Sequence, residues 1–97
     1  MAQVRIDRRV QGLLPGYLER CAGDLRTVRE AAGRGDFLAI RAIGHRLAGA
    51  GGLYGLDEVS AKGREINRAA HAADAEAARL AAEDLERYLA ELDPEFV

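Results

Sequence analysis

Residues 14–32 read LPGYLERCAGDLRTVREAA, and their apolar residues recur at intervals of three and four positions. This spacing places them on one side of an α-helix, because a helix turns once in about 3.6 residues. Pro15 falls in the first turn, where its missing N–H group costs nothing, and Gly33 and Gly35 end the segment. The pattern predicts a helix with one buried stripe, formed by Leu14, Leu18, Cys21, Leu25, Val28 and Ala32.

Three further segments have a similar pattern. Asp36 is a candidate N-cap for a second helix that runs from Phe37 to about Leu53. A third helix begins near Asp57, and Asp74 caps a fourth helix, which Pro94 ends. The inward positions of the last two helices are Leu56, Val59, Gly63, Ile66 and Ala70, followed by Ala81, Leu85, Tyr88 and Leu92.

The connections between these helices are only a few residues long, so consecutive helices are expected to be antiparallel. The predicted fold is all-α: an antiparallel up-down-up-down four-helix bundle with a short N-terminal helix around Asp7–Gly12. No repeat or linker divides the chain, and residues 1–97 are expected to form a single domain. Cys21, which lies on the buried stripe, is expected to be a small core residue.

The composition excludes several classes of function. The chain has 97 residues, 14 basic and 16 acidic side chains, and a single cysteine, which rules out an internal disulfide or a thiolate zinc cage. No apolar run reaches the roughly 18 residues of a membrane span. No dense basic stripe interleaved with aromatic residues suggests nucleic-acid binding. The sequence therefore predicts a cytoplasmic protein that binds neither a membrane nor a nucleic acid.

The predicted second helix carries a histidine on its outer side. When each residue advances by about 100°, His45 falls nearly opposite the core face of that helix. The core face comprises Phe37, Ile40, Ile43, Gly44, Leu47, Gly51 and Tyr54. Five glycines also gather here, although each costs about 1 kcal/mol relative to alanine inside a helix. They are Gly44, Gly49, Gly51, Gly52 and Gly55.

Small residues beside His45 leave room for another backbone to approach. Arg41, one turn earlier, and the adjacent Arg46 supply positive charge that suits a phosphoryl group. We therefore interpret this face as a docking surface that contains a nucleophile. Its predicted docking residues are Leu38, Ala42, Ala48, Gly49 and Gly52.

The run from His45 to Gly55 resembles the signature of histidine-containing phosphotransfer (Hpt) domains of two-component phosphorelays. The family pattern is matched by His45, Leu47, Gly49, Gly52 and Gly55, and Gly35-Asp36-Phe37 is also similar to the family. The resemblance implies a phosphorelay intermediate without kinase activity, which accepts a phosphoryl group on His45 from a receiver-domain aspartate and passes it to another receiver. By analogy the reactive atom is Nε2.

The resemblance also implies the partners: a response-regulator receiver domain, a hybrid histidine kinase, or both. The chain itself is expected to be a monomer that binds no metal or cofactor. Mg²⁺ and the acidic pocket that holds it are expected to come from the receiver domain.

Two positions depart from the family pattern. The usual lysine three residues after the histidine, which is thought to steady the phosphoryl charge, is Ala48 here, and a glutamate common in the next helix is Asn67. Arg41 is a candidate to replace the lysine, and Arg46 is a weaker one because it points about 100° away. His71, near the end of the third helix, is interpreted as a surface residue.

Two other hypotheses stay open. A binding module of the same fold would dock on a receiver or kinase without being phosphorylated, and the alanine at position 48 motivates this alternative. A structural bundle would self-associate through Leu38 and the glycine-rich face. A small-molecule enzyme is disfavoured, because no second polar group is recognisably paired with His45 as an acid or base.

Overall fold

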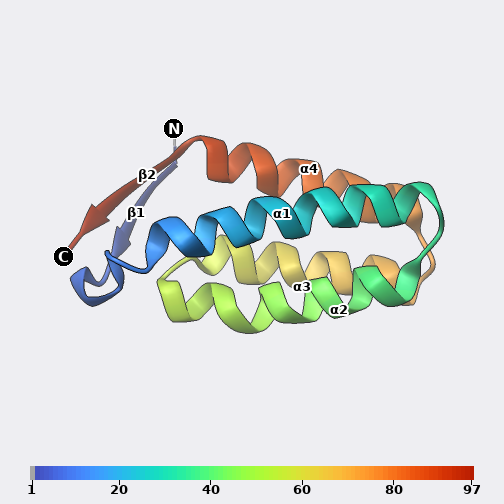
Figure 1. Ribbon diagram of the computed structural model, residues 1–97, viewed down its shortest axis with the longest axis horizontal. Helices are drawn as coiled ribbons and strands as arrows, with labels where there is room; N and C mark the ends of the chain where they lie inside the picture. The colour runs from blue at the N-terminus through green and yellow to red at the C-terminus, as the bar shows by residue number, and fades with distance from the viewer. Residues whose placement is uncertain (1) are drawn as a thin grey trace.

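Four helices form the body of the molecule. The computed structural model describes residues 2–97, excluding the side chain of Ala2. Successive helices run antiparallel and are joined by short connections, so the predicted four-helix bundle is confirmed (Figure 1). The helices are α1 (Leu14–Gly33), α2 (Phe37–Ala50), α3 (Asp57–His71) and α4 (Ala75–Ala90).

The helix starts follow the capping residues in the sequence. Asp36 accepts a hydrogen bond from the backbone N–H of Ala39 at 3.2 Å, and Asp74 accepts one from Ala77 at 3.0 Å. Both carboxylates therefore satisfy N–H groups that have no partner within the first turn of the helix. The second helix ends earlier than expected, at Ala50, and continues as the 3₁₀ turn η2 (Gly51–Tyr54).

The core lies along the axis of the bundle, between the four helices. Cys21 is 1% exposed, which confirms its predicted place in the core. The largest buried side chains are Ile6, Leu25, Ile40, Leu56, Ile66, Leu85, Val28 and Val59. No helix within residues 2–97 is both long enough and apolar enough to span a bilayer.

Both ends of the chain differ from the prediction. The prediction of a short helix around Asp7–Gly12 is wrong. In its place, strand β1 (Ala2–Ile6) is followed by a single 3₁₀ turn, η1 (Arg8–Val10). Helix α4 stops at Ala90, so Leu92 and Pro94 lie in strand β2 (Leu92–Phe96) and not in or at the end of a helix.

The two strands pair in parallel, from Ala2 opposite Leu92 to Ile6 opposite Phe96. Figure 1 shows this ribbon beyond one end of the bundle, next to both chain ends. Because each strand of a two-stranded sheet has an open edge, Pro94 can lie in β2 although it has no N–H group. The pairing joins the two ends of the sequence, and a local pattern does not reveal it.

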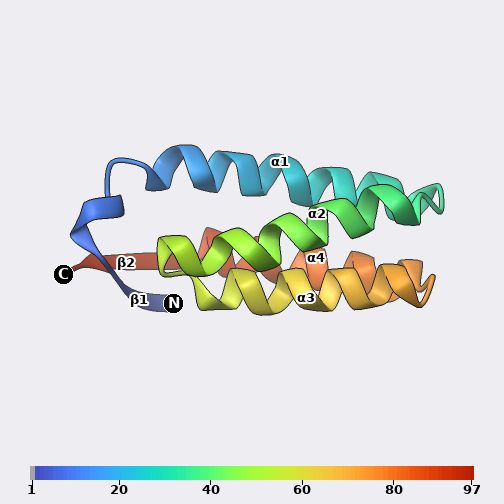
Figure 2. The ribbon, with the colours of Figure 1, turned by 90° about the horizontal axis from the view of Figure 1, so that it is seen from below.

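Helices α2 and α3 pack more closely than ordinary side chains would allow. A Cβ atom on Gly63 would lie 2.4 Å from the backbone nitrogen of Ala48, and one on Gly44 would lie 2.8 Å from that of Asn67. Figure 2 shows the two helices side by side along their length. The pair of glycines fixes which residues of α3 lie beside His45.

Candidate functional site

His45 lies near the middle of α2 and is exposed. Its neighbours Ile43, Gly44 and Leu47 are buried, as the helical pattern predicted. Of the predicted docking residues, Leu38 is 75% exposed, and Ala42, Gly49 and Gly52 are also exposed, whereas Ala48 is half-buried. The structure therefore places the imidazole on a surface of small side chains with one prominent leucine.

Two shallow hollows flank the imidazole, one toward each end of α2. Their linings share only His45 and Asn67. The first, which we call the Ala48 hollow, is lined by His45, Ala48, Arg64, Asn67 and Arg68. The second, the Arg41 hollow, is lined by Leu38, Arg41, Ala42, His45, Asn67 and His71. A group bound at His45 would thus touch residues of α3 as well as α2.

Asn67 connects α3 to α2 and lines both hollows beside the histidine. Its side-chain Nδ2 donates a hydrogen bond to the backbone oxygen of Arg41 at 3.1 Å. In a regular helix that oxygen also accepts the N–H of His45, which lies four residues later. Asn67 therefore holds the turn from which the imidazole projects, and it does so with a neutral amide.

The side chains that line the two hollows beside His45 carry positive charge. Arg41, Arg64 and Arg68 are exposed, and none of them forms an ion pair within residues 2–97. No aspartate or glutamate lines either hollow in the described part of the chain. The site can attract an anion, but it offers no carboxylates to a metal ion.

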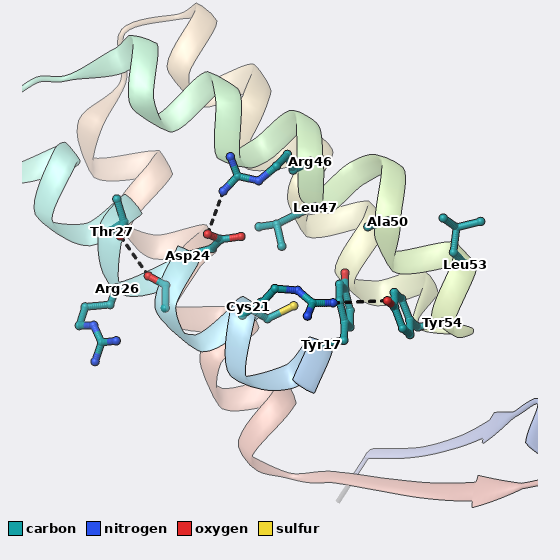
Figure 3. Close-up of a pocket in the computed structure, with 12 residues that line it drawn as sticks. Tyr17, Cys21, Asp24, Arg26, Thr27, Arg46, Leu47, Ala50, Leu53 and Tyr54 are labelled. Carbon is teal, nitrogen blue, oxygen red and sulfur yellow. Dashed lines mark hydrogen bonds and ion pairs between the residues drawn. The ribbon is translucent and has the colours of Figure 1, made fainter. Parts of the chain in front are cut away.

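Arg46, the other predicted phosphate neighbour, lies elsewhere. Its guanidinium donates to a carboxylate oxygen of Asp24 on α1 at 2.8 Å (Figure 3). It lines a larger pocket of about 670 Å³ between α1 and α2, and it lines neither hollow beside His45. The structure therefore brings Arg41, but not Arg46, to the histidine.

Two stacked tyrosines form one end of that larger pocket. The rings of Tyr17 and Tyr54 lie 4.0 Å apart between centroids and are nearly parallel (Figure 3). The Tyr17 hydroxyl is buried without a hydrogen-bond partner in the described residues, and burial raises its pKa. Burial also raises the pKa of the Cys21 thiol, which disfavours the reactive thiolate.

The five glycines in and after the second half of α2 have different roles. Gly44 and Gly51 make room for α3, since a Cβ atom on Gly51 would lie 2.6 Å from the nitrogen of Ser60. Gly55 has a φ angle of +76°, which favours glycine and closes η2. Gly49 has nothing within 4 Å of its Cβ position, and Gly52 has only the Ser60 hydroxyl at 3.8 Å. Of the five, Gly49 and Gly52 are the two exposed glycines with neither a close backbone contact nor a positive φ angle.

Arg64 and Arg68 were not predicted from the sequence, and His71 was predicted only to lie on the surface. His71 is exposed at the end of α3 and lines the Arg41 hollow. The two arginines reach the Ala48 hollow because Gly63 presses α3 against α2. The available signal was Gly63, a glycine at an inward position of the third helix. It does not show that Arg64 and Arg68 lie beside His45 until its contact with Ala48 is known.

Within residues 2–97, no three His, Cys, Asp or Glu side chains are grouped so as to hold a metal ion. The expectation that Mg²⁺ comes from the partner receiver domain stays a prediction.

Comparison with known proteins identifies the family. A sequence model described as the Hpt domain matches residues 12–95, which includes all four helices. No match was found among curated proteins or among solved structures. The match covers most of the chain and includes the helix that presents His45. The chain therefore belongs to the Hpt domain family, whose members take part in two-component phosphorelays and interact with receiver domains and kinases.

Proposed function

We propose that His45 is the phosphoacceptor of a phosphorelay, receiving a phosphoryl group from a receiver-domain aspartate and passing it to another receiver. The observation that carries the proposal is the exposed imidazole between two hollows whose arginines are unpaired in residues 2–97. These arginines favour a phosphoryl anion, and histidine supplies a neutral nucleophile near neutral pH.

The transfer exchanges one bond to phosphorus for another. The electron pair of the unprotonated ring nitrogen, Nε2 by family analogy, forms the N–P bond. The bond between phosphorus and the aspartyl oxygen breaks, and its electrons remain on the carboxylate. The proton on the other ring nitrogen then leaves to water. Transfer to a second receiver aspartate reverses these steps.

The partner completes the site. Phosphoryl transfer depends mostly on alignment and on neutralising charge, and the chain contributes a nucleophile and cations. The receiver domain contributes the phosphorylated aspartate and the carboxylates that hold Mg²⁺. We expect it to dock on Leu38, Ala42, Ala48, Gly49 and Gly52. We expect the chain to act as a monomer in the cytoplasm.

The test is to mix the chain with a ³²P-labelled receiver domain and Mg²⁺. Label should move to the chain as phosphate that is labile in acid and stable in alkali, and His45→Gln should abolish it. His71→Gln is the matched variant, because it removes the only other histidine and should still take label. Absence of label in the wild type, or equal label in His45→Gln, would refute the proposal.

A second candidate function is a docking module that is not phosphorylated. It is favoured by the alanine at position 48, where the family usually has a lysine. It predicts a complex with a receiver domain whose affinity survives His45→Ala, with no transfer of label.

Sedimentation tests the separate hypothesis that the chain is a structural bundle that self-associates. A chain that is monomeric at micromolar concentration would exclude that hypothesis.

A further inference from the structure

We infer that Arg64 and Arg68 of α3 hold the phosphoryl group on His45. They would take the place of the lysine that the family usually has at position 48, which is alanine in this chain. The inference rests on the proposed function of His45. The positive charge that binds the phosphoryl group then comes from α3, whereas the histidine comes from α2.

The contact between α2 and α3 brings these arginines to the site. Gly63 packs directly on the backbone of Leu47 and Ala48, with its Cβ position 2.8 Å from the carbonyl carbon of Leu47 and 2.4 Å from the nitrogen of Ala48. Arg64 is the next residue, and Arg68 follows one helical turn later on the same side. Both line the Ala48 hollow together with His45.

The small side chain at position 48 gives the hollow its space. Ala48 is half-buried at its wall, so a longer side chain there would occupy the space beside the imidazole. An arginine presents a planar fork of donors that binds two oxygens of a phosphoryl group at once, which a lysine cannot do. Two arginines from the opposite wall therefore suit a phosphoryl group in this hollow.

The neighbouring cations are less suited to this role. Arg41 lines the hollow on the other side of His45. Arg46 is paired with Asp24, and Lys62 is paired with Glu65 at 3.1 Å and with Asp84 at 3.5 Å. In the part of the chain that the structure describes, Arg64 and Arg68 are the basic residues that line the Ala48 hollow and have no acidic partner.

The test is the rate of label transfer at saturating receiver. The double variant Arg64→Ala/Arg68→Ala should be slower by about tenfold or more, because the loss of even one charge-assisted hydrogen bond corresponds to about that factor. Arg26→Ala is the control for a positive charge lost outside the site: Arg26 is exposed on α1 and unpaired in residues 2–97, and its removal lowers the net charge by one without touching either hollow.

Rescue separates a chemical role from a structural one. Adding Ala48→Lys to the double variant should restore much of the rate, because it returns a cation to the same hollow. Circular dichroism checks that the variants keep their helices. Transfer by the double variant at the wild-type rate would overturn the inference while leaving the proposed function intact, and so would a failure of Ala48→Lys to restore a lost rate.

A titration with inorganic phosphate tests the site without a receiver domain. The ring signals of His45 in an NMR spectrum should shift with phosphate in the wild type and in Arg26→Ala, and should shift much less in the double variant. Equal shifts in the double variant would overturn the inference. If the wild type takes no label but this difference is seen, the proposed function fails and the anion site at Arg64 and Arg68 stands.

Discussion

The close contact between α2 and α3 gives the most direct test of the structure. In Gly63→Ala the new methyl group would lie 2.4 Å from the nitrogen of Ala48 and 2.8 Å from the carbonyl carbon of Leu47. Both atoms belong to a helix backbone, so the two helices must separate. Overpacking of this kind costs about 1–3 kcal/mol, and contact with the backbone places it near 3 kcal/mol.

The same substitution also improves helix propensity, which offsets part of that cost. Alanine is favoured over glycine inside a helix by about 1 kcal/mol, so the net loss of unfolding free energy in Gly63→Ala is about 2 kcal/mol. Gly49→Ala is the matched control, because nothing lies within 4 Å of its Cβ position. It should gain up to about 1 kcal/mol, since the propensity effect acts there without a clash.

Urea unfolding followed by circular dichroism measures the difference. The two variants should differ by about 3 kcal/mol in unfolding free energy, and by more than about 10 °C in Tm for a chain of this size. Equal stability of Gly63→Ala and Gly49→Ala would refute the close packing of α2 on α3. It would also remove the geometric reason for placing Arg64 and Arg68 beside His45.

Three further substitutions test other parts of the fold. Tyr17→Phe should raise the unfolding free energy by about 1 kcal/mol, because it removes a buried hydroxyl without a partner in the described residues; a loss of stability in urea would reveal an unrecognised partner. Gly35→Ala should cost about 1–2 kcal/mol in the same assay, since φ is +69° there and nothing else lies within 4 Å; a gain would contradict the left-handed turn. The Arg9 side chain lowers the pKa of Asp7 from 3.8 to about 2. A carboxyl with a lowered pKa stabilises the folded state above about pH 4, so the unfolding free energy of the wild type should exceed that of Asp7→Asn there, and this excess should shrink between pH 4 and pH 2. An excess that does not change with pH would contradict the pairing of Asp7 with Arg9.

Local patterns predicted the bundle well because the information is local. Asp36 and Asp74 each cap a helix within three residues, and the stripe through Cys21 and Leu25 needs only the period of a helix. The parallel pairing of β1 with β2 escaped prediction, since it joins segments about 90 residues apart. The Pro94 signal was interpreted as a helix end, although it lies in a strand with an open edge.

The sequence predicted only the part of the candidate site that lies on α2. The exposure of His45 and of Leu38 follows from the angles around α2. The contribution of α3, Arg64 and Arg68, depends on which face of α3 packs against α2. This contact cannot be read from the pattern of a single helix. For the same reason the pairing of Arg46 with Asp24, which lies on a different helix, was not foreseen.

The distribution of ion pairs explains how a chain with a net charge of −2 presents a cationic face. The acidic residues of α4 engage cations away from His45: Glu86 pairs with Arg29, Asp84 with Lys62 and Glu83 with Arg79. The arginines around His45 are left without acidic partners in residues 2–97.

A phosphoryl group that enters this face would meet a nucleophile and positive charge, but no carboxylate along either hollow. In phosphoryl transfer the negative charge lies on the phosphoryl oxygens and develops on the leaving group, and both need to be neutralised. Under the proposed function, the leaving side belongs to the aspartate of the other protein, together with its metal. The same cations that hold the phosphoryl group would then attract the acidic pocket of the receiver. Removing Arg64 and Arg68 should therefore weaken docking, and because they also hold the phosphoryl group, transfer should stay slow at saturating receiver, where a loss of docking alone would have no effect.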